Sequence, residues 1–344
     1  MGGKYQNIET TMTVVPRISI LMAVYNTEGF LPAAIDSVID QTFGQWELIC
    51  INDGSTDNSL HVLNHYKAKD PRIIVIDRPH CGKNASTRNA GLVIARGQYI
   101  AMLDSDDRIE PTYLDKLIAR QQQTQADIII SSIYYWDYKN SKISRSLTGL
   151  YGDTSKILSG KEAFALSLHW QIGGIGLHHA DTMRKLKYLE IVWGDEYTTR
   201  LCFLGANIVA FSDAIYYYRE NPTSDTKRFS YKLFLAIGVK SKLLTLIRKS
   251  NFERNIYISY KEEIALDLFS NYAGFLKSQR FLSQKEKTMV LVCLGTVTVN
   301  ICKEFFLSPN SIKSTIHIMK QLFTMLWRGI KKRIASLMSR AKKQ

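Results

Sequence analysis

The chain has 344 residues, of which 45% are hydrophobic, 22% charged and 11% aromatic, with 20 Gly and 7 Pro. This composition excludes a collagen, a low-complexity disordered chain and a small disulfide scaffold. The five cysteines are scattered and form no CxxC pair, which argues against a zinc site or a disulfide framework and favours a reducing compartment. The length suits two domains, or one large domain with an extension.

The net charge of +14 is concentrated near the C-terminus. Residues 311–344 contain nine Lys or Arg and no Asp or Glu, which leaves only +5 for the rest of the chain. Apolar residues recur in this segment every three or four positions, at Ile312, Ile316, Met319, Phe323, Leu326, Ile330, Ile334 and Leu337. A basic amphipathic helix of this kind predicts an anchor on an anionic membrane surface. The alternative is a helix that packs on its own domain and leaves its basic face in water.

Two other segments bear on a membrane location. Residues 1–16 are expected to form a loose arm, because they lack the basic and apolar pattern of a secretory signal. The most apolar run, residues 289–302, has about 14 residues, below the roughly 18–20 that span a bilayer. We therefore expect a buried helix there.

Short apolar runs alternate with segments of helical spacing between residues 17 and 110. The pattern predicts strands at 18–24, 48–51, 73–76 and 99–103, and helices at 30–39, 59–69 and 88–95. This alternation, with short links, predicts an α/β fold with a mostly parallel sheet and helices on both faces. Ligands bind such sheets at the carboxyl ends of the strands, so a ligand site is expected at that edge of residues 17–110.

Residues 111–229 continue the α/β pattern, and a helical extension is expected over residues 230–344. In the first of these segments we predict helices at 111–123, 159–168 and 195–205, and strands at 128–135, 208–211 and 214–218. Ser159 and Glu162 form a capping box at the start of the second helix. The extension has expected breaks near residues 251, 283 and 309.

Carboxylates follow two of the predicted strands. Asp53 and Asp57 follow the second strand, and Asp104, Asp106 and Asp107 follow the fourth. Helix capping accounts for Ser55, Thr56 and Asp57, but it does not account for three Asp within four residues. Such a cluster is costly unless a cation neutralises it, and oxygen ligands suit Mg²⁺ or Mn²⁺ bound together with substrate phosphates. The alternative is a plain acidic loop.

An ordered set of motifs over residues 16–225 resembles the family 2 inverting glycosyltransferases. The matching segments are 16–26, 41–43, 47–49, Asn52-Asp53-Gly54-Ser55-Thr56-Asp57, Arg88-Asn89-Ala90-Gly91, 97–100 and Leu103-Asp104-Ser105-Asp106-Asp107. The resemblance implies a GT-A fold, a nucleotide-sugar donor and a divalent metal. It also implies that residues 17–110 form the nucleotide-sugar-binding half, and that residues 111–229 form the acceptor-binding half with the catalytic base.

The resemblance assigns roles at matched positions. Nucleotide-sugar-binding positions are Ala23, Tyr25, Glu28, Asp53, Arg88, Asp104 and Ser105. Asp53 would bond the base, preferably uracil, although Asn52 replaces the first Asp of a pair that is frequent in the family. Arg88 would approach the base or the diphosphate. Asp104 and Asp106 form the Asp-x-Asp motif, in which Asp106, with Asp107, would hold Mn²⁺ or Mg²⁺.

The catalytic base is expected in residues 193–201, which resemble the family's Glu-Asp motif at the head of a helix. Asp195 and Glu196 are the candidates. Glu196 lies four residues before Arg200, which favours an ion pair, whereas Asp195 has no charged residue at that spacing. A helix start also favours an ionised carboxylate, so Asp195 is the preferred base, although Gly194 replaces the first Glu.

Several glycine, histidine, tryptophan and basic residues near this motif are further candidates for substrate contacts. The Gly173-Gly174-Ile175-Gly176 run has the wrong spacing for a dinucleotide fingerprint and is expected to form an acceptor-side loop. His178 and His179 are not expected to share a metal. Trp170 and Trp193 are acceptor-sugar platforms or core residues. Arg219 and Lys227 contact a diphosphate or belong to a strand followed by a solvated basic loop.

The motifs and the resemblance predict a metal-dependent inverting transferase, expected to be cytoplasmic and peripheral on the inner face of the plasma membrane. The resemblance alone implies a role in cell-surface polysaccharide synthesis. The expected partners are a nucleotide-sugar, a glycan or lipid-linked acceptor and the membrane surface. Nucleic acid is not expected, because no aromatic residues are interleaved with the basic tail. The rivals are a membrane-tethered binding module without turnover and a sugar-1-phosphate nucleotidyltransferase, whose Gly-rich loop after the first strand is missing.

Overall fold

The fold is described from a computed structural model of the chain. It describes residues 15–137, 140–220 and 231–306. The chain divides into two compact units, residues 1–221 and residues 222–344. Both halves of the predicted α/β region therefore lie in the first unit.

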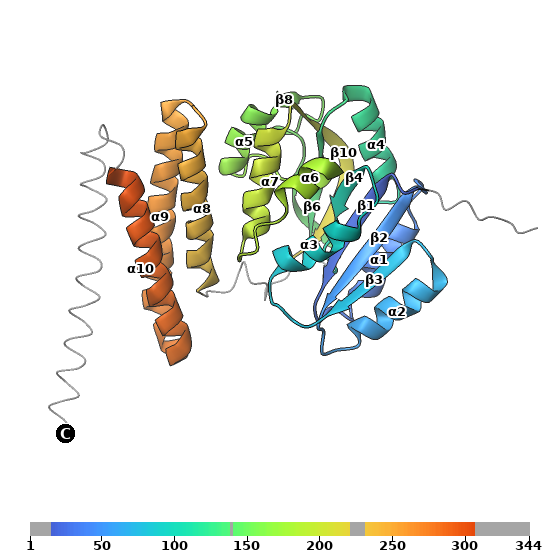
Figure 1. The fold of residues 1–344 in the computed structure, drawn as a ribbon, viewed down its shortest axis with the longest axis horizontal. Helices are drawn as coiled ribbons and strands as arrows, with labels where there is room; N and C mark the ends of the chain where they lie inside the picture. Colours follow the sequence, from blue (N-terminus) through green and yellow to red (C-terminus); the bar gives the residue numbers. More distant parts are fainter. Residues whose placement is uncertain (1–14, 138–139, 221–230, 307–344) are drawn as a thin grey trace, which may run out of the picture. The chain divides into compact units, whose positions relative to one another are not determined.

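The first unit is built on one mixed sheet (Figure 1). Its strands run in the order β3-β2-β1-β4-β9-β6-β10-β5, with β7 paired to β6 and β8 to β10. Their bounds are β1 Ile18–Val24, β2 Trp46–Asp53, β3 Ile73–Arg78, β4 Tyr99–Met102, β5 Arg108–Ile109, β6 Ile128–Asp137, β7 Lys142–Leu147, β8 Ile157–Ser159, β9 Gly176–His179 and β10 Ile208–Arg219. Strands β3, β2, β1 and β4 are parallel, whereas β9 is antiparallel to both β4 and β6.

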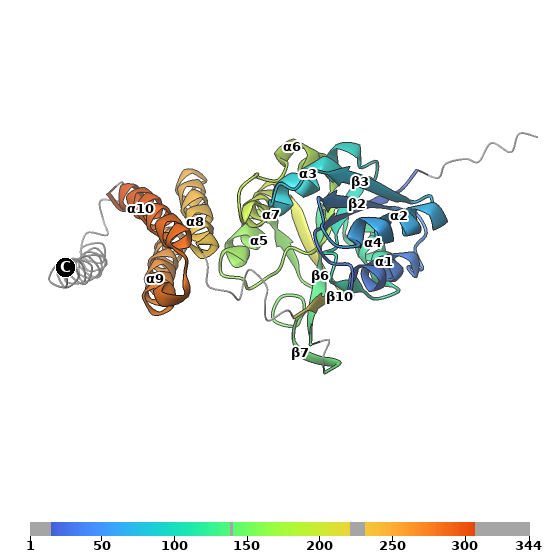
Figure 2. The same ribbon diagram turned by 90° about the horizontal axis from the view of Figure 1, so that it is seen from below.

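Helices cover both faces of this sheet (Figure 2). One face carries α1 Leu31–Ile39, α2 Ser59–Lys69 and α4 Tyr113–Thr124, and the other carries α3 Asn84–Ile94, α5 Gly160–Leu168, α6 Ala180–Leu186 and α7 Gly194–Gly205. Strand β1 is buried on both sides, as its nearly continuous apolar sequence predicts, and Ile18, Ile20 and Met22 join the core under α1 and α4.

Close packing of α3 on the other face depends on Gly91. A Cβ at this position would lie 2.7 Å from Ile51 Cδ1 and 3.1 Å from Leu21 Cδ2. The missing side chain therefore lets the helix approach β1 and β2, and it sets the position of Arg88 one turn earlier on the same helix.

The predicted elements are present with shifts at several ends, and some elements are additional. Strand β1 and helix α2 have the predicted bounds, and the capping box of α5 is formed as predicted. The two strands predicted at 208–211 and 214–218 are wrong as separate elements, because they are one strand, β10, with an irregularity between Phe211 and Ile215. Helix α3 begins four residues before the predicted start, and β5, β7, β8, β9 and α6 were not predicted.

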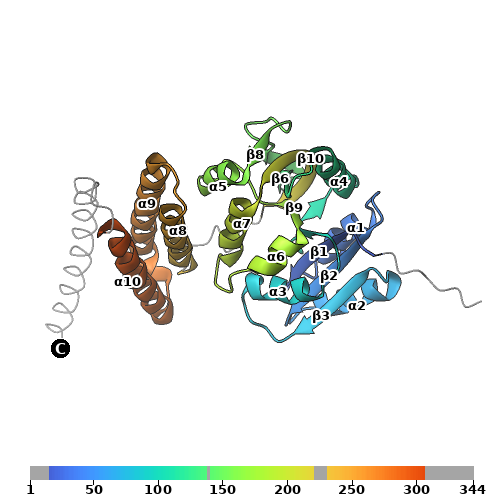
Figure 3. The same cartoon turned by 45° about the horizontal axis from the view of Figure 1, so that its top comes forward.

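The second unit contains three described helices, α8 Lys232–Lys249, α9 Arg254–Ser278 and α10 Gln284–Phe306, with a short 3₁₀ turn at Gln279–Phe281 (Figure 3). Their breaks match the predicted ones near residues 251 and 283. Phe234, Leu244, Ile264 and Leu268 are fully buried in this unit. Among the described residues, no helix has the length and apolarity to cross a membrane. The predicted basic helix and the break near residue 309 lie outside the described residues.

Candidate active site

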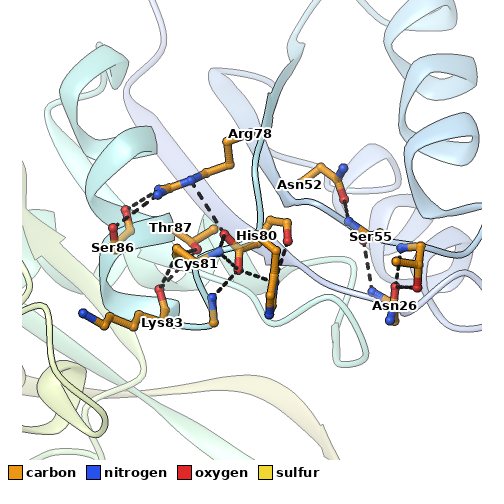
Figure 4. Close-up of polar contacts among 12 residues, drawn as sticks. Asn26, Asn52, Ser55, Arg78, His80, Cys81, Lys83, Ser86 and Thr87 are labelled. Carbon is orange, nitrogen blue, oxygen red and sulfur yellow. Dashed lines mark hydrogen bonds and ion pairs between the residues drawn. The ribbon is translucent and has the colours of Figure 1, made fainter.

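Two loops at the carboxyl ends of β1 and β2 are joined by hydrogen bonds (Figure 4). Asn26 has a left-handed backbone (φ 52°), its Oδ1 accepts the backbone N–H of Thr56 at 2.8 Å, and its own N–H bonds to Ser55 Oγ at 3.1 Å. Asp57 accepts the N–H of Glu28 and the first N–H of α2, both at 3.0 Å. The expectation that Ser55 and Thr56 cap α2 is therefore wrong, because they bond to the neighbouring loop.

Asp53 is the last residue of β2, and its carboxylate is 5% exposed. Its oxygens accept the backbone N–H groups of Cys81 at 3.2 Å and Gly82 at 3.0 Å, and His80 Nδ1 lies 3.0 Å away (Figure 4). Burial raises the pKa of Asp53, but the hydrogen bonds from Cys81 and Gly82 and the charge of His80 outweigh it and lower the pKa overall. The carboxylate is thus held ionised in one orientation.

Three other predicted nucleotide-sugar-binding residues, Ala23, Tyr25 and Glu28, lie at the same edge of the sheet as Asp53. Tyr25 is 44% exposed and stacks on His80, with the ring centres 4.1 Å apart. Glu28 accepts the N–H of Asn58 at 2.7 Å, so its carboxylate also joins the two loops. Ala23 is paired with Ile51 in the sheet. His80 was missed from the sequence, although it follows β3 at the same edge of the sheet.

Arg88 connects the Asp-x-Asp loop after β4 to the predicted base on helix α7. Its guanidinium is buried and donates to Asp104 Oδ1 and to Asp195 Oδ2, both at 2.7 Å. Burial disfavours the charge, but Asp104 and Asp195 outweigh this effect and raise the pKa of Arg88. The expectation that Asp195 has no charged partner is therefore wrong, because the partner lies 107 residues away rather than on the same helix.

The Asp cluster after β4 is neutralised by protein groups. Arg219 Nη2 bonds to Asp106, while its backbone N–H donates to Asp107 Oδ1 at 2.7 Å. The Tyr216 hydroxyl donates to Asp107 Oδ2 at 2.7 Å and accepts the N–H of Asp104 at 3.1 Å. Asp107 is 2% exposed, and burial, with Asp104 and Asp106 nearby, raises its pKa well above the usual range. Its carboxylate fixes the end of β10.

Two of these carboxylates, Asp104 and Asp106, fit a divalent cation. Asp107, the expected partner of Asp106, is instead buried, with its oxygens bonded to Tyr216 and Arg219. The Asp104 and Asp106 side chains are 42% and 29% exposed. Burial, and then the charge of Asp104, raises the pKa of Asp106 despite Arg219, which is the repulsion that a cation would relieve. In the described part of the chain, no three His, Cys, Asp or Glu side chains are grouped to hold an ion. An ion held by these two carboxylates would complete its coordination with other oxygen ligands, such as water or a phosphate.

Ser105 and Arg219 are buried beside this cluster. The Ser105 hydroxyl accepts that of Thr27 at 3.1 Å, which ties the loop after β4 to the loop after β1. Arg219 is 5% exposed and lies 3.7 Å from the Phe30 ring centre. The predicted diphosphate contact of Lys227 lies outside the described residues.

Helix α7 presents its two acidic residues differently. Glu196 forms an ion pair with Arg200, with Oε1 3.1 Å from Nη2, as the i, i+4 spacing predicts, and its side chain is 10% exposed. Asp195 is 36% exposed. Helix α7 begins at Gly194, where the backbone lies close to the carbonyl oxygen of Leu189. A Cβ at this position would clash with that oxygen, so the close approach requires glycine. This close packing gives a structural reason for glycine at that position.

A cavity of about 250 Å³ opens beside Asp195. Its walls come from α3, β4 and the loop after it, β10, α5, α7 and the loop that precedes β9. The lining residues include Arg88, Asp104, Trp170, Gly174, Trp193, Asp195, Glu196, Arg200 and Tyr218. Gly173 and Gly174 line the cavity, and a Cβ on Gly174 would clash with Thr199.

The two adjacent histidines of β9 lie apart. His178 is buried and its Nε2 lies 2.9 Å from the Gly174 carbonyl, whereas His179 Nδ1 accepts the N–H of Asp181. Burial lowers the pKa of His178. Within the described residues, neither belongs to a group of side chains that could hold a metal.

Comparisons with known proteins bear on this site. Residues 19–183 match the family model for glycosyl transferase family 2. The chain is 26% identical to the glycosyltransferase GlyA of Streptococcus pneumoniae over 79% of its own length and 42% of that protein, and 27% identical to the uncharacterized glycosyltransferase EpsJ of Bacillus subtilis over 90% and 84%. It therefore spans less than half of GlyA.

A solved structure also has this fold. S. aureus TarS residues 1–349, in complex with UDP-GlcNAc, superposes with a TM-score of 0.64 at 18% identity, over 83% of this chain and 81% of that one. Residues 19–183 thus form a glycosyl transferase family 2 domain with the GT-A fold.

Proposed function

We propose that the protein is an inverting, metal-dependent glycosyltransferase that moves a sugar from a UDP-sugar to a glycan or lipid-linked acceptor in polysaccharide synthesis. The main support is the Arg88 bridge, which joins Asp104 of the Asp-x-Asp motif to Asp195 on one wall of a single cavity. A donor-side carboxylate and an exposed carboxylate are thereby within reach of one substrate pair.

The donor nucleotide binds along the loops after β1, β2 and β3 in this proposal. Asp53 accepts a hydrogen bond from the imino N–H of uracil, and Tyr25 packs on the base. TarS was solved with UDP-GlcNAc, which supports UDP as the nucleotide. Asp104 and Asp106 are the residues that would hold Mn²⁺ or Mg²⁺, which supplies Lewis-acid stabilisation of the leaving diphosphate.

Asp195 acts as the general base. Its carboxylate removes the proton of the attacking acceptor hydroxyl, whose oxygen bonds to the anomeric carbon as the bond to the diphosphate oxygen breaks, with inversion. Arg88 holds Asp195 in place through the 2.7 Å hydrogen bond. Glu196 keeps Arg200 in place and does not take the proton.

A donor screen tests this function. UDP-, GDP- and dTDP-sugars are incubated with Mn²⁺ and the wild type, Asp106→Asn, Asp195→Asn or, as a control, Asp213→Asn, whose carboxylate is 68% exposed beside Lys116. We expect turnover of one donor, its loss in Asp106→Asn and wild-type turnover in Asp213→Asn. Once an acceptor is known, Asp195→Asn should lower transfer by about 10²–10⁴-fold.

The absence of both turnover and metal-dependent nucleotide binding would contradict the transferase, whereas nucleotide binding without turnover of any donor would favour the non-catalytic binding module. Formation of a sugar nucleotide from a sugar 1-phosphate would favour the nucleotidyltransferase.

We further propose a peripheral location on the inner face of the plasma membrane. The support is the basic, amphipathic pattern of residues 311–344.

A further inference from the structure

We propose that the turn between α9 and α10 docks on an anionic lipid surface, with the Phe281 ring among the acyl chains and Lys277 and Arg280 beside the headgroup phosphates. This inference rests on the proposed peripheral location and deepens it. It assigns a lipid contact to the described helices of the second unit, in addition to residues 311–344.

Helix α9 has two apolar faces. One face is buried in the second unit and carries Ile264 and Leu268. The other carries Leu266, Phe269 and Leu276, which are 70%, 40% and 38% exposed and lie within an arc of about 80° at about 3.6 residues per turn. A surface helix normally has polar residues opposite its buried stripe. The second apolar stripe therefore indicates a contact with a further partner.

The turn that follows this stripe exposes a further aromatic ring. Phe281 ends the 3₁₀ turn and is 75% exposed, although removal of such a ring from water is favourable. The Arg280 guanidinium lies 4.6 Å from the ring centre of Phe281. An apolar ring beside a cation is typical of a membrane interface, where the ring enters the acyl region and the charge remains with the headgroups.

The charges around the turn favour an anionic partner. Residues 269–292 contain four Lys or Arg, at positions 277, 280, 285 and 287, and one acidic residue, Glu286. Glu286 accepts the N–H of Ser283 at 2.8 Å and its hydroxyl at 2.7 Å, so its carboxylate caps the start of α10. An excess of cations beside an apolar surface attracts anionic headgroups, whereas a second copy of the same surface would be repelled.

Two carboxylates on another side of α9 are neutralised by the protein. Lys240 of α8 donates to Glu263 Oε1 and to Asp267 Oδ2, both at 2.6 Å. Burial disfavours the charge of Lys240, but these two carboxylates outweigh this effect and raise its pKa. They therefore add little repulsion toward an anionic surface. Glu262 precedes the exposed stripe at its end away from the turn, so the lipid contact is expected to be strongest at the turn.

Vesicle flotation of the full chain tests the proposal. The vesicles contain phosphatidylcholine alone or an equimolar mixture of phosphatidylcholine and phosphatidylglycerol. The wild type should bind the anionic vesicles, and Phe281→Ser should bind them at least about tenfold more weakly. Phe281→Trp, which keeps an aromatic ring, should stay within about threefold of the wild type. The control is Val93→Ser, which removes a 76% exposed apolar side chain from the first unit and should bind as the wild type does.

A charge reversal separates a local contact from the net charge of the chain. Lys277→Glu/Arg280→Glu should weaken binding to the anionic vesicles at least about tenfold, because both cations lie at the proposed lipid surface. The matched control is Lys67→Glu/Lys69→Glu, in the last turn of α2, which changes the net charge by the same amount. This control should weaken binding by less than about threefold.

A tryptophan at position 281 reports the depth of the turn directly. In anionic vesicles with brominated acyl chains, Phe281→Trp should lose more of its fluorescence than the wild type with its five tryptophans. The difference between the two proteins comes from the added indole, so it measures whether position 281 reaches the acyl chains.

Three results would overturn the proposal. They are a Phe281→Ser variant that binds vesicles as Val93→Ser does, a charge reversal in α9 no more harmful than that in α2, and an added tryptophan that brominated lipid does not quench. Vesicle binding that resists all these changes would contradict this inference alone and leave the proposed location intact. A wild type that binds neither kind of vesicle contradicts the proposed location together with this inference, whereas the donor screen tests the transferase separately.

Discussion

Replacement of Arg88 by methionine removes the charge that joins Asp104 and Asp195 while keeping an apolar stem of similar length. The guanidinium makes two charge-assisted hydrogen bonds of 2.7 Å, and loss of a buried partner costs about 3–5 kcal/mol. The two carboxylates are 42% and 36% exposed, so water solvates them again and the low end applies. We expect a loss of about 3 kcal/mol, or roughly 6–12 °C in Tm for a unit of this size.

Urea unfolding followed by circular dichroism, without nucleotide, measures the effect. The control is Lys156→Met, whose ion pair with Asp153 spans 3.6 Å between side chains that are 57% and 43% exposed. Because water screens this pair, its loss should cost far less stability than the loss of the Arg88 charge. The double variant Arg88→Met/Asp195→Asn should recover part of the loss, because one unpaired carboxylate is then absent. A loss no larger than that of Lys156→Met, or no recovery in the double variant, would refute the reasoning.

Three further outcomes follow from the contacts described above. Burial lowers the pKa of His178 in the folded protein, so the unfolded chain takes up a proton first as the pH falls below about 6.5, and the stability of the fold declines there. The variant His178→Gln should therefore lose less stability than the wild type between pH 7.5 and 5.5, as measured by urea unfolding. An equal decline in the two proteins would contradict this role of His178. Glu196→Gln should cost about 2 kcal/mol through Arg200 in the same assay and should reduce transfer less than Asp195→Asn, whereas the reverse order would make Glu196 the base. Gly160→Ala should cost about 1–3 kcal/mol, because its Cβ would clash with α7 carbonyl oxygens, while the control Gly205→Ala, whose Cβ meets nothing within 4 Å, should cost nothing; equal Tm values for the two variants would contradict this packing.

Elements with a strong local pattern were predictable from the sequence. The mostly apolar sequence of β1 locates that strand, and the Ser159–Glu162 capping box locates the start of α5. The β9 strand was not predictable in this way, since Gly176–His179 is short and starts with a glycine. In β10, Ser212 and Asp213 interrupt the apolar pattern where the pairing register shifts, so one strand resembles two.

The site was predictable as a set of residues but not as a set of contacts. Motif order identified Arg88, Asp104 and Asp195, yet the bridge between them joins residues 107 and 16 positions apart. Helical spacing detects only partners on one helix, as it did for Glu196 and Arg200. The same limit applies to Asp107, whose partners Tyr216 and Arg219 lie on a distant strand.

Interleaving of the strands has a consequence for how this chain is made and how it can be recombined. Strand β4 ends at Met102, but its neighbour in the sheet, β9, ends at His179. During synthesis the edge of β4 that pairs with β9 therefore stays unpaired until more than seventy further residues have been made. Strand β5 stays unpaired for even longer, until β10 has been made. A chimaera that exchanges residues 111–220 between relatives must therefore match the hydrogen-bonding edges of β4 and β5, as well as the substrate cavity.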